Sequence, residues 1–398
     1  MKSTARAFVG LFFILSPPCL YQAYSQTATS RRPTSPSKNI PSRTYVGDAA
    51  CSSCHQEKTA TFLATSHHLT SSPADEHSIA GNFNSGSNIL RTSNPSLHFV
   101  MSKKDDGFFQ TAVDEIDPSQ AISVEQRFDI VIGSGRKAQT YLYWKGDELF
   151  ELPVSYWVET VQWINSPGYA DGALRFDRPI VPRCLECHGS RFESLAPPAN
   201  RFNKDSLVFG ITCEKCHGPG SEHVAHHQSE PVGTPSEAII NPGRLPRERQ
   251  LDACALCHAG AATSLVPPGS FVPGDVLAKF LKIPDPGHDV PVDVHGNQMQ
   301  LLRQSRCFQS SAMTCTTCHD VHTRQRDAAS FSFHCLSCHK AADCGEFHKL
   351  GQQIASNCVD CHMPLQDSEL LFSDTNGQKI KPKVRNHRIA IYANPATR

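Results

Sequence analysis

The sequence lacks an excess of charge of either sign, long hydrophobic runs and a large stock of aliphatic residues. Lys plus Arg number 38 and so do Asp plus Glu, so the 398-residue chain is formally neutral, without the basic bias of nucleic-acid-binding proteins. No segment is apolar for long enough to span a bilayer as a helix. Apolar residues make up only 39% and include 17 Cys, while 28 Pro and 24 Gly work against long regular elements. We therefore expect the core to need material that is not protein.

The N-terminus has the order of features found in secretory signal peptides. Two basic residues precede the apolar run Ala7–Leu15, and prolines and a small-residue site ending at Ser25 follow it. Cleavage there removes residues 1–25 and leaves 26–44, rich in Ser, Thr and Pro, as a flexible leader. Lipidation of Cys19 is the alternative, although two prolines directly before it fit a lipoprotein site poorly. We predict an exported protein of the periplasm or the extracellular surface, with no transmembrane segment in the mature chain.

Fourteen of the 17 Cys fall into one repeated pattern, Cys-x-x-Cys-His. In chain order the seven copies are Cys51, Cys54 and His55; Cys184, Cys187 and His188; Cys213, Cys216 and His217; Cys254, Cys257 and His258; Cys315, Cys318 and His319; Cys335, Cys338 and His339; and Cys358, Cys361 and His362. At this content of Cys and His, chance alone would produce roughly 0.04 copies. The repetition therefore reflects a chemical requirement that recurs seven times.

The spacing within this pattern is that of covalent haem attachment. Two thiols three residues apart add to the two vinyl groups of haem as thioethers, and the next residue lies under the iron, where a neutral imidazole coordinates it. Structural zinc is the rival interpretation, but zinc ribbons need no His after the second Cys. Thioredoxin-like redox pairs would not recur seven times. We therefore predict seven covalent haems c, attached through the fourteen motif Cys, with the seven motif His as proximal iron ligands.

Two cysteines, Cys307 and Cys344, remain outside the motifs after the signal peptide is removed. In an oxidising compartment such a pair forms one disulfide, and the alternative is two buried free thiols. The sequence leaves both possibilities open.

The motifs are spread unevenly, and this spread indicates the organisation of the chain. The predicted segments are a first haem segment at 45–95, a β-rich module without a haem motif at 96–182, a six-haem domain at 183–365 and a C-terminal tail at 366–398. The predicted fold class is α+β with little regular structure. It consists of short helices and loops around stacked haems, with an inserted small antiparallel β-module.

Residues from about 96 to 165 carry the pattern of strands. The segments rich in β-branched and aromatic residues are Phe128–Ile132, Gln139–Trp144 and Glu148–Trp157. Between the last two, Lys145–Asp147 predicts a hairpin turn. Gly133–Ala138 superficially matches a dinucleotide-binding fingerprint, but a strand pattern follows where a helix is required, so we interpret it as a glycine-rich β-turn.

Thirteen His lie outside the motifs, more than seven irons need, so bis-His ligation is the default; it lowers the reduction potential relative to Met/His ligation. His322 follows His319 by three residues and cannot reach the distal face of the same haem, so it must serve a neighbouring haem. His223, six residues after His217, invites the same argument. We predict a helix from Glu57 to His68, and two further distal candidates, His67 and His68, lie at its end. The distal candidates are His67, His68, His223, His295, His322 and His348, then the weaker His98, His288, His334 and His387, whereas His77, His226 and His227 are expected to face solvent.

Several stretches resemble a known group of proteins. They are YVGDAACSSCHQE, TSHHLTS, GSGRKAQTYLYWKGDELFELPVSYW, SPGY, GITCEKCHGPGSEHV, NPGRLPRERQLDACALCHAG and SRCFQSSAMTCTTCHDVH. The chain resembles multihaem c-type cytochromes of the superfamily that contains hydroxylamine oxidoreductase and pentahaem nitrite reductase. Within that superfamily it looks like exported bacterial proteins that often carry tetratricopeptide repeats.

The resemblance covers roughly residues 45–365 and implies distal ligation by His67 or His68, by His223 and by His322. Two departures limit it. No tetratricopeptide repeat follows residue 365, so repeat-mediated partner binding is not implied. The Cys-x-x-Cys-Lys active-site variant of the nitrite reductases is also absent, which weakens a nitrite-reductase interpretation.

The leading functional hypothesis is an electron carrier that passes electrons between redox partner proteins outside the cytoplasm through closely packed, mostly bis-His haems. The alternative is a multihaem oxidoreductase that acts on a small nitrogen or sulfur compound at one haem with an open sixth site. Arg136, Lys137, Arg183 and Arg303 would then be available to bind an anion, although each is by default solvated or paired with a haem propionate. A third hypothesis gives the β-module a binding or adhesion role. No nucleic-acid partner is expected.

Overall fold

The computed structural model describes residues 44–116, 122–195, 197–231, 234–236, 238–285, 287, 289–325 and 327–392. The described residues belong to one compact unit, which contains all seven motifs. The predicted signal peptide, the leader before Thr44 and the weaker candidate His288 lie outside the described residues. Within these described ranges, no helix combines the length and the apolar character that a membrane crossing needs.

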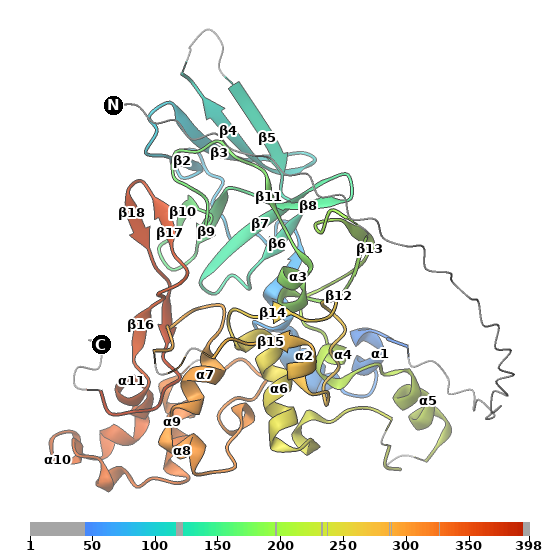
Figure 1. Cartoon of the computed structure of the whole chain (residues 1–398), viewed down its shortest axis with the longest axis vertical. Coiled ribbons are helices and arrows are strands. Elements are labelled where there is room, and N and C mark those ends of the chain that lie inside the picture. The colour runs from blue at the N-terminus through green and yellow to red at the C-terminus, as the bar shows by residue number, and fades with distance from the viewer. Residues whose placement is uncertain are drawn as a thin grey trace, which may run out of the picture. The chain divides into compact units, whose positions relative to one another are not determined.

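Two antiparallel sheets form the β-rich part of this unit (Figure 1). The smaller sheet has the order β2 (Ile89–Arg91), β3 (Leu97–Lys104), β4 (Gly107–Asp114) and β5 (Ile122–Arg127). The larger sheet has the order β1 (Ser71–Pro73), β6 (Ile130–Ile132), β7 (Ala138–Lys145), β8 (Glu148–Glu151) and β11 (Arg178–Pro179), and β7 also pairs with β9 (Val154–Trp157), which pairs with β10 (Gln162–Asn165). A small antiparallel β-module is therefore present, as predicted, and its strands begin at residue 71 and end at residue 179.

The turns of this module follow the glycine pattern of the sequence. The hairpin predicted at Lys145–Asp147 joins β7 to β8, with Lys145 opposite Glu148 and Gly146 at a φ of 64°, a conformation that favours glycine. The segment Gly133–Ala138 leads from β6 directly into β7, so a strand follows it and the dinucleotide interpretation is excluded.

The β-module has a protein core of its own. Side chains alternate along β3, so that Leu97, Phe99 and Met101 are buried, and Phe128 stacks on Tyr141 with ring centroids 4.3 Å apart. This core does not include any of the Cys-x-x-Cys-His motifs.

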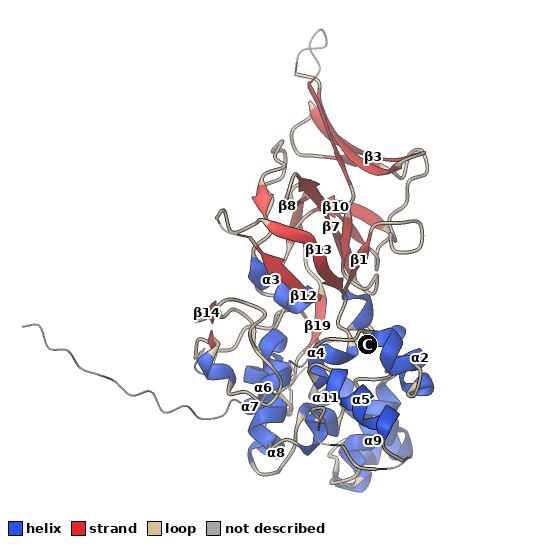
Figure 2. Ribbon diagram, turned by 90° about the vertical axis from the view of Figure 1, so that its right-hand side faces the viewer, coloured by secondary structure: helices blue, strands red, loops and turns tan. Residues whose placement is uncertain are grey.

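The helices are short and gather at the opposite end of the unit from the sheets (Figure 2). They are α1 (Asp48–Ser52), α2 (Gln56–Leu63), α3 (Pro182–His188), α4 (Cys213–His217), α5 (Ser221–Ser229), α6 (Arg247–His258), α7 (Gln298–Arg303), α8 (Arg306–Gln309), α9 (Ala328–Leu336), α10 (Phe347–Leu350) and α11 (Cys358–His362). Single turns of 3-10 helix are η1 (His68–Thr70), η2 (Pro242–Arg244), η3 (Leu277–Lys279), η4 (Cys315–Thr317) and η5 (Ala341–Asp343), with a longer η6 (Gly351–Ser356). The helix predicted from Glu57 to His68 ends at Leu63. The chain turns after it, and a separate 3-10 turn, η1, begins at His68.

Short antiparallel strand pairs are present in addition to the two sheets and the helices. They are β12 (Gly189–Ser194) with β13 (Phe202–Phe209), β14 (Thr263–Ser264) with β15 (Leu281–Lys282), β16 (Leu365–Asp367) with β19 (Lys383–Arg385), and β17 (Ser373–Thr375) with β18 (Gln378–Ile380). The residues predicted as a C-terminal tail thus contain strands. The amide of Asn165 in β10 donates to the carbonyl of Asp374 at 2.7 Å, which fixes the β17–β18 hairpin against the larger sheet.

Candidate functional site

The seven motifs, numbered 1 to 7 in chain order, line one continuous cavity. All twenty-one of their Cys and His contribute to its wall, and its volume is about 4020 Å³. An ordinary small-molecule pocket holds about 300–1,000 Å³, so this cavity has room for several large flat ligands. The helical half of the molecule is therefore arranged around this space, as expected for a chain poor in aliphatic residues.

The local backbone puts the first Cys and the His of a motif on one side. Motifs 2, 3, 4 and 7 lie in α3, α4, α6 and α11. In motifs 1, 5 and 6, the His N–H donates to the carbonyl of the first Cys, four residues earlier, at 2.9–3.0 Å. Residues four apart lie above one another on a helical turn, so the thiol and the imidazole point the same way.

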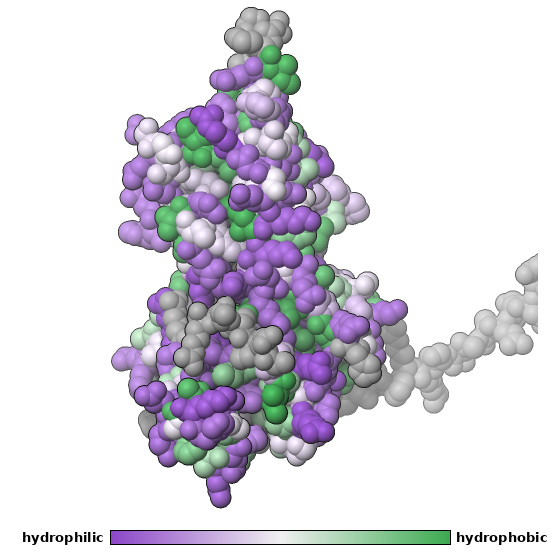
Figure 3. Space-filling view, turned by 90° about the vertical axis from the view of Figure 1, so that its left-hand side faces the viewer, coloured by the Kyte–Doolittle hydropathy of each residue, from purple (hydrophilic) through white to green (hydrophobic). Residues whose placement is uncertain are grey.

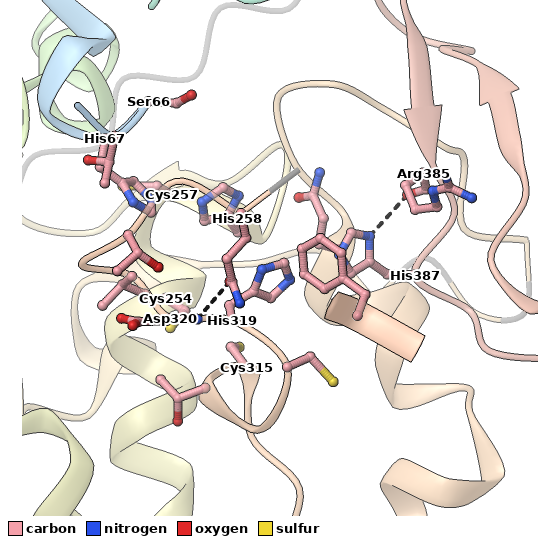
Figure 4. A pocket seen from close by; sticks show the side chains of 18 of the residues that line it. Ser66, His67, Cys254, Cys257, His258, Cys315, His319, Asp320, Arg385 and His387 are labelled. Atoms are coloured by element: carbon pink, nitrogen blue, oxygen red, sulfur yellow. Dashed lines mark hydrogen bonds between the residues drawn. The ribbon is translucent and has the colours of Figure 1, made fainter. Parts of the chain in front are cut away.

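Four motif His each face a second imidazole across the cavity. The ring centroids are 6.3 Å apart for His55 and His223, 6.1 Å for His217 and His322, 6.3 Å for His319 and His387, and 6.2 Å for His67 and His258. Figure 4 shows how the last two pairs meet from separate parts of the chain. An iron bonded at about 2 Å to a nitrogen on each side holds two imidazole centroids about 6 Å apart, so these four pairs fit a metal between their rings.

A fifth motif His, His188, has His295 as its neighbour. Burial, together with a smaller effect of the nearby imidazole of His295, lowers the pKa of His188 to about 4. On the other side of the ring, Nδ1 of His188 lies 2.9 Å from the Thr70 hydroxyl. His188 is thus held by a hydrogen bond on one nitrogen while the other remains for a ligand.

Backbone carbonyls hold one ring nitrogen of several of these His. Nδ1 of His217 donates to the Ile240 carbonyl at 2.8 Å, that of His362 to Ala390 at 2.9 Å and that of His387 to Arg385 at 3.0 Å. Such a bond leaves Nε2 unprotonated, which is the form that coordinates a metal. Burial likewise lowers the pKa of both His67 and His387 to about 4, so both rings are neutral at neutral pH.

The other predicted distal residues lie elsewhere. The His68 ring packs edge-on against Phe62 at 6.0 Å, with Nδ1 3.9 Å from the Asp48 carboxylate. His348 is exposed on α10. His387, ranked among the weaker residues, faces His319. Within the described ranges, neither His339 nor His362 stacks with a second imidazole.

The basic residues named for anion binding mostly have protein partners. Lys137 pairs with Glu159 at 2.6 Å, and Arg303 lies 3.6 Å from the Glu248 carboxylate. Arg183 pairs with Glu186 and donates to the Leu256 carbonyl at 2.7 Å. These three side chains are therefore already paired with carboxylate or carbonyl groups of the protein. Cys307 and Cys344 are not bonded to each other in the structure, as the fourteen motif Cys are not bonded to any group, so the disulfide and the two free thiols both stay predictions.

Sequence reasoning did not single out Glu214, which lies inside motif 3. Its carboxylate is 4% exposed and accepts the backbone N–H groups of Val46 at 2.9 Å, Gly47 at 2.8 Å and Gly220 at 2.8 Å. Gly220 is the N-cap of α5, which carries His223, whereas Val46 and Gly47 lead into α1. Glu214 thus fixes both elements that bring His55 and His223 together. An acidic residue between the two Cys of a motif is the only signal of this in the sequence.

Among the described residues, no group of three or more His, Cys, Asp or Glu is arranged to hold a bare metal ion. The imidazole pairs fit a different arrangement, an iron whose remaining four ligands come from a porphyrin. The fourteen motif thiols around the same cavity supply the groups that would attach such a macrocycle covalently.

Comparisons with known proteins agree with this chemistry. The sequence profile of the cytochrome c554 and c-prime family matches residues 169–218, which contain motifs 2 and 3. The outer cell wall cytochrome OcwA is similar in structure, with a TM-score of 0.53 and 18% identity over 83% of this chain and 78% of that chain, so the two share a fold. An undecahaem cytochrome from the S-layer of Carboxydothermus ferrireducens matches with a TM-score of 0.40 and 18% identity over 88% of this chain and 52% of its own. No curated protein matches the sequence. The narrower resemblance to hydroxylamine oxidoreductase and nitrite reductase stays a prediction.

Proposed function

We propose that this protein is an exported c-type cytochrome with seven covalent haems, which carries electrons between redox partners outside the cytoplasm. The observation that carries the proposal is the set of four imidazole pairs at 6.1–6.3 Å, each containing a motif His. Neither a zinc ribbon nor a thiol redox pair requires this arrangement. The haems supply reversible one-electron chemistry, and the protein fixes and coordinates them.

Four of the proposed distal ligands follow from these pairs, and the fifth, His295, is proposed because it is the neighbouring imidazole of His188. Each motif His is the proximal ligand of its own haem. The proposed distal ligands are His223 for motif 1, His295 for motif 2, His322 for motif 3, His67 for motif 4 and His387 for motif 5. Saturating both axial positions keeps the irons from binding substrate and lowers their potentials, which suits electron transfer.

The proposed location is the periplasm or the cell surface. The name of the structural relative, an outer cell wall cytochrome, supports this, as does the signal-like sequence of residues 1–25. On the face drawn in Figure 3, polar side chains predominate and apolar ones are scattered in small groups. A polar surface of this kind suits transient redox encounters better than a permanent interface.

Two measurements on protein from a host that matures c-type cytochromes test the proposal. Intact mass spectrometry should show seven haem adducts on the processed chain. Electron paramagnetic resonance of the oxidised protein should show mainly low-spin iron. Colourless protein, or a mass without tetrapyrrole adducts, would overturn the proposal.

A second candidate function is an oxidoreductase acting on a small nitrogen or sulfur compound. The observation that favours it is that, within the described residues, neither His339 nor His362 has an imidazole neighbour of the kind that His55, His217, His258 and His319 have in ring contact and that His188 has in His295. A stoichiometric high-spin signal that shifts on adding nitrite or hydroxylamine would support this function, and a wholly low-spin protein would exclude it.

A further inference from the structure

The β-module contains no haem motif, yet one of its strands begins at the cavity that the motifs line. This strand is β1, which pairs with β6 so that Ser71 lies opposite Ile132. It directly follows η1, whose last residue, Thr70, contributes to the cavity wall. The junction between η1 and β1 is therefore common to the β-module and the cavity.

Two neighbouring hydroxyl groups at this junction hold the His of motif 2. The Thr70 oxygen lies 2.9 Å from Nδ1 of His188, and the Ser71 hydroxyl donates to the backbone carbonyl of His188. One contact fixes the imidazole ring, and the other fixes the backbone of the same residue. Because Nδ1 is engaged, Nε2 is the nitrogen left for an iron. Nδ1 then carries the ring proton and donates a hydrogen bond to the Thr70 oxygen.

The backbone of Thr70 is itself held by the glycine-rich turn that follows β6. The N–H of Gly133 donates to the Thr70 carbonyl at 2.8 Å. Gly133 has a φ of 110°, in the region that favours glycine, and a Cβ on this residue would collide with the Ala138 carbonyl. The turn for which the dinucleotide interpretation is excluded therefore has a different role, which is to fix the residue that contacts His188.

A second part of the chain holds the same segment. The N–H of Gly210 donates to the Ser71 hydroxyl at 2.9 Å, and the N–H of Ile211 donates to the His67 carbonyl at 3.0 Å. A Cβ at Gly210 would collide with the His68 carbonyl, so a larger residue could not approach the segment this closely. Backbone contacts to two separate parts of the chain therefore fix the residues from His67 to Ser71.

We propose that Thr70 is a positioning residue of the haem site at motif 2, and that its hydroxyl lowers the reduction potential of that haem by accepting a hydrogen bond from Nδ1 of His188. The proposal rests on the proposed function, since it needs a haem at this motif; each proposed haem site has the number of its motif. A hydrogen bond from Nδ1 makes the imidazole a stronger electron donor, which stabilises ferric iron relative to ferrous iron. It also fixes the plane of the ring.

The kind of acceptor separates this contact from two others of the same type. Nδ1 of His217 and Nδ1 of His362 bond to backbone carbonyls, which a substitution does not remove. The acceptor for His188 is a side chain, so its effect on the haem can be removed without changing the ligand. The β-module thus bears on the electronic state of site 2 through one hydroxyl group.

Two substitutions of Thr70 test the proposal in the haem-loaded protein. Thr70→Val removes the hydroxyl and keeps the β-branched shape, whereas Thr70→Ser keeps the hydroxyl. In a redox titration, we expect Thr70→Val to raise the potential of one haem and Thr70→Ser to leave all potentials unchanged. The low-spin electron paramagnetic resonance signal of one haem should shift in Thr70→Val as well, because its ring loses a fixed orientation. Thr61→Val is the matched control, since Thr61 is exposed on α2 and its hydroxyl bonds to carbonyls of its own helix.

A Thr70→Val protein that carries seven haems by mass and has unchanged or lowered potentials would overturn the role of Thr70 and leave the proposed function intact. An equal rise in Thr70→Val and Thr70→Ser would also overturn it, because the cause would then be packing and not the hydroxyl. If Thr70→Val does not retain its haems, Thr70→Ala takes its place with the same expectation. Unsubstituted protein without haem adducts would contradict the proposed function itself, before any variant is compared.

Discussion

Single side chains act on the candidate site in two ways. Some are imidazoles that face a motif His, such as His223, His322 and His387. Others are polar groups that hold the backbone of a motif, such as Glu214 and Asp48. The first kind decides what an iron binds, and the second decides where the motif lies. The two kinds are separable by experiment, because loss of a ligand changes the spin state, whereas loss of a backbone contact first changes stability.

Replacing His387 by alanine removes the ring opposite His319. We expect one low-spin haem to become high-spin and to bind carbon monoxide, because its sixth position is then open. Electron paramagnetic resonance and a carbon monoxide titration measure this. His77→Ala is the matched control, since His77 is exposed. If both variants keep the native spectrum, His387 is not a ligand.

Glu214→Gln removes the charge that accepts three backbone N–H groups and turns an amide NH₂ toward them. We expect the free energy of unfolding to fall by about 1–3 kcal/mol, measured in urea. The low-spin signal of the haem between His55 and His223 should change with it, because both elements that carry these His lose an anchor. Glu57→Gln, on the exposed face of α2, is the control. Equal stability of the two variants would contradict the anchoring role.

At the scale of elements, β19 bears on two of the motifs at which haem is proposed, motif 5 and motif 7. Arg385 at its end donates to the carbonyls of Val359 at 3.1 Å and Met363 at 2.9 Å, and pairs with Asp360 at 2.7 Å, so it holds α11 of motif 7. Two residues later the same segment presents His387 to His319 of motif 5. The position of β19 thus bears on sites 5 and 7 together.

Arg385→Ala should therefore disturb sites 5 and 7 and leave site 1 unchanged. We expect a loss of about 1–3 kcal/mol in unfolding free energy, because buried carbonyls lose a charged donor. Redox titration should show at least two shifted potentials. Lys383→Ala, two residues earlier and exposed, is the control. Shifts confined to one haem would show that β19 does not couple the two sites.

The elements also show how much of the structure can be predicted from the sequence. The hairpin at Gly146 and the β-turn at Gly133 are predictable, because turn chemistry is local. His223 and His322 are predictable as residues that serve another motif, because the chain between each of them and the preceding motif is too short. The position of His387 is not, because it depends on the pairing of β19 with β16. Strands of three residues carry too little pattern to predict a partner.

At the scale of the whole molecule, the apoprotein and the proposed holoprotein should differ in net charge. The full-length sequence has an isoelectric point of about 7.3, and removal of residues 1–25, with two basic residues and no acidic one, lowers that value before any haem is added. Each haem brings two propionates, which the charge of a ferric core only partly offsets, so the holoprotein should be acidic. Isoelectric focusing of the oxidised protein measures this, with denatured, haem-free chain as the reference. A holoprotein value at or above neutrality would contradict seven haems.

The imidazole pairs also imply an order in which the proposed haem sites would gain their second ligands during maturation. If the chain is exported and carries haem at its motifs as proposed, the ring that faces the motif 1 imidazole emerges with residue 223, and those for motifs 2, 3 and 5 emerge with residues 295, 322 and 387. Only motif 4 would find its second imidazole already outside. Most irons would then remain half-ligated until later segments arrive, and a nascent chain cut short before residue 387 would carry an incompletely ligated haem at motif 5.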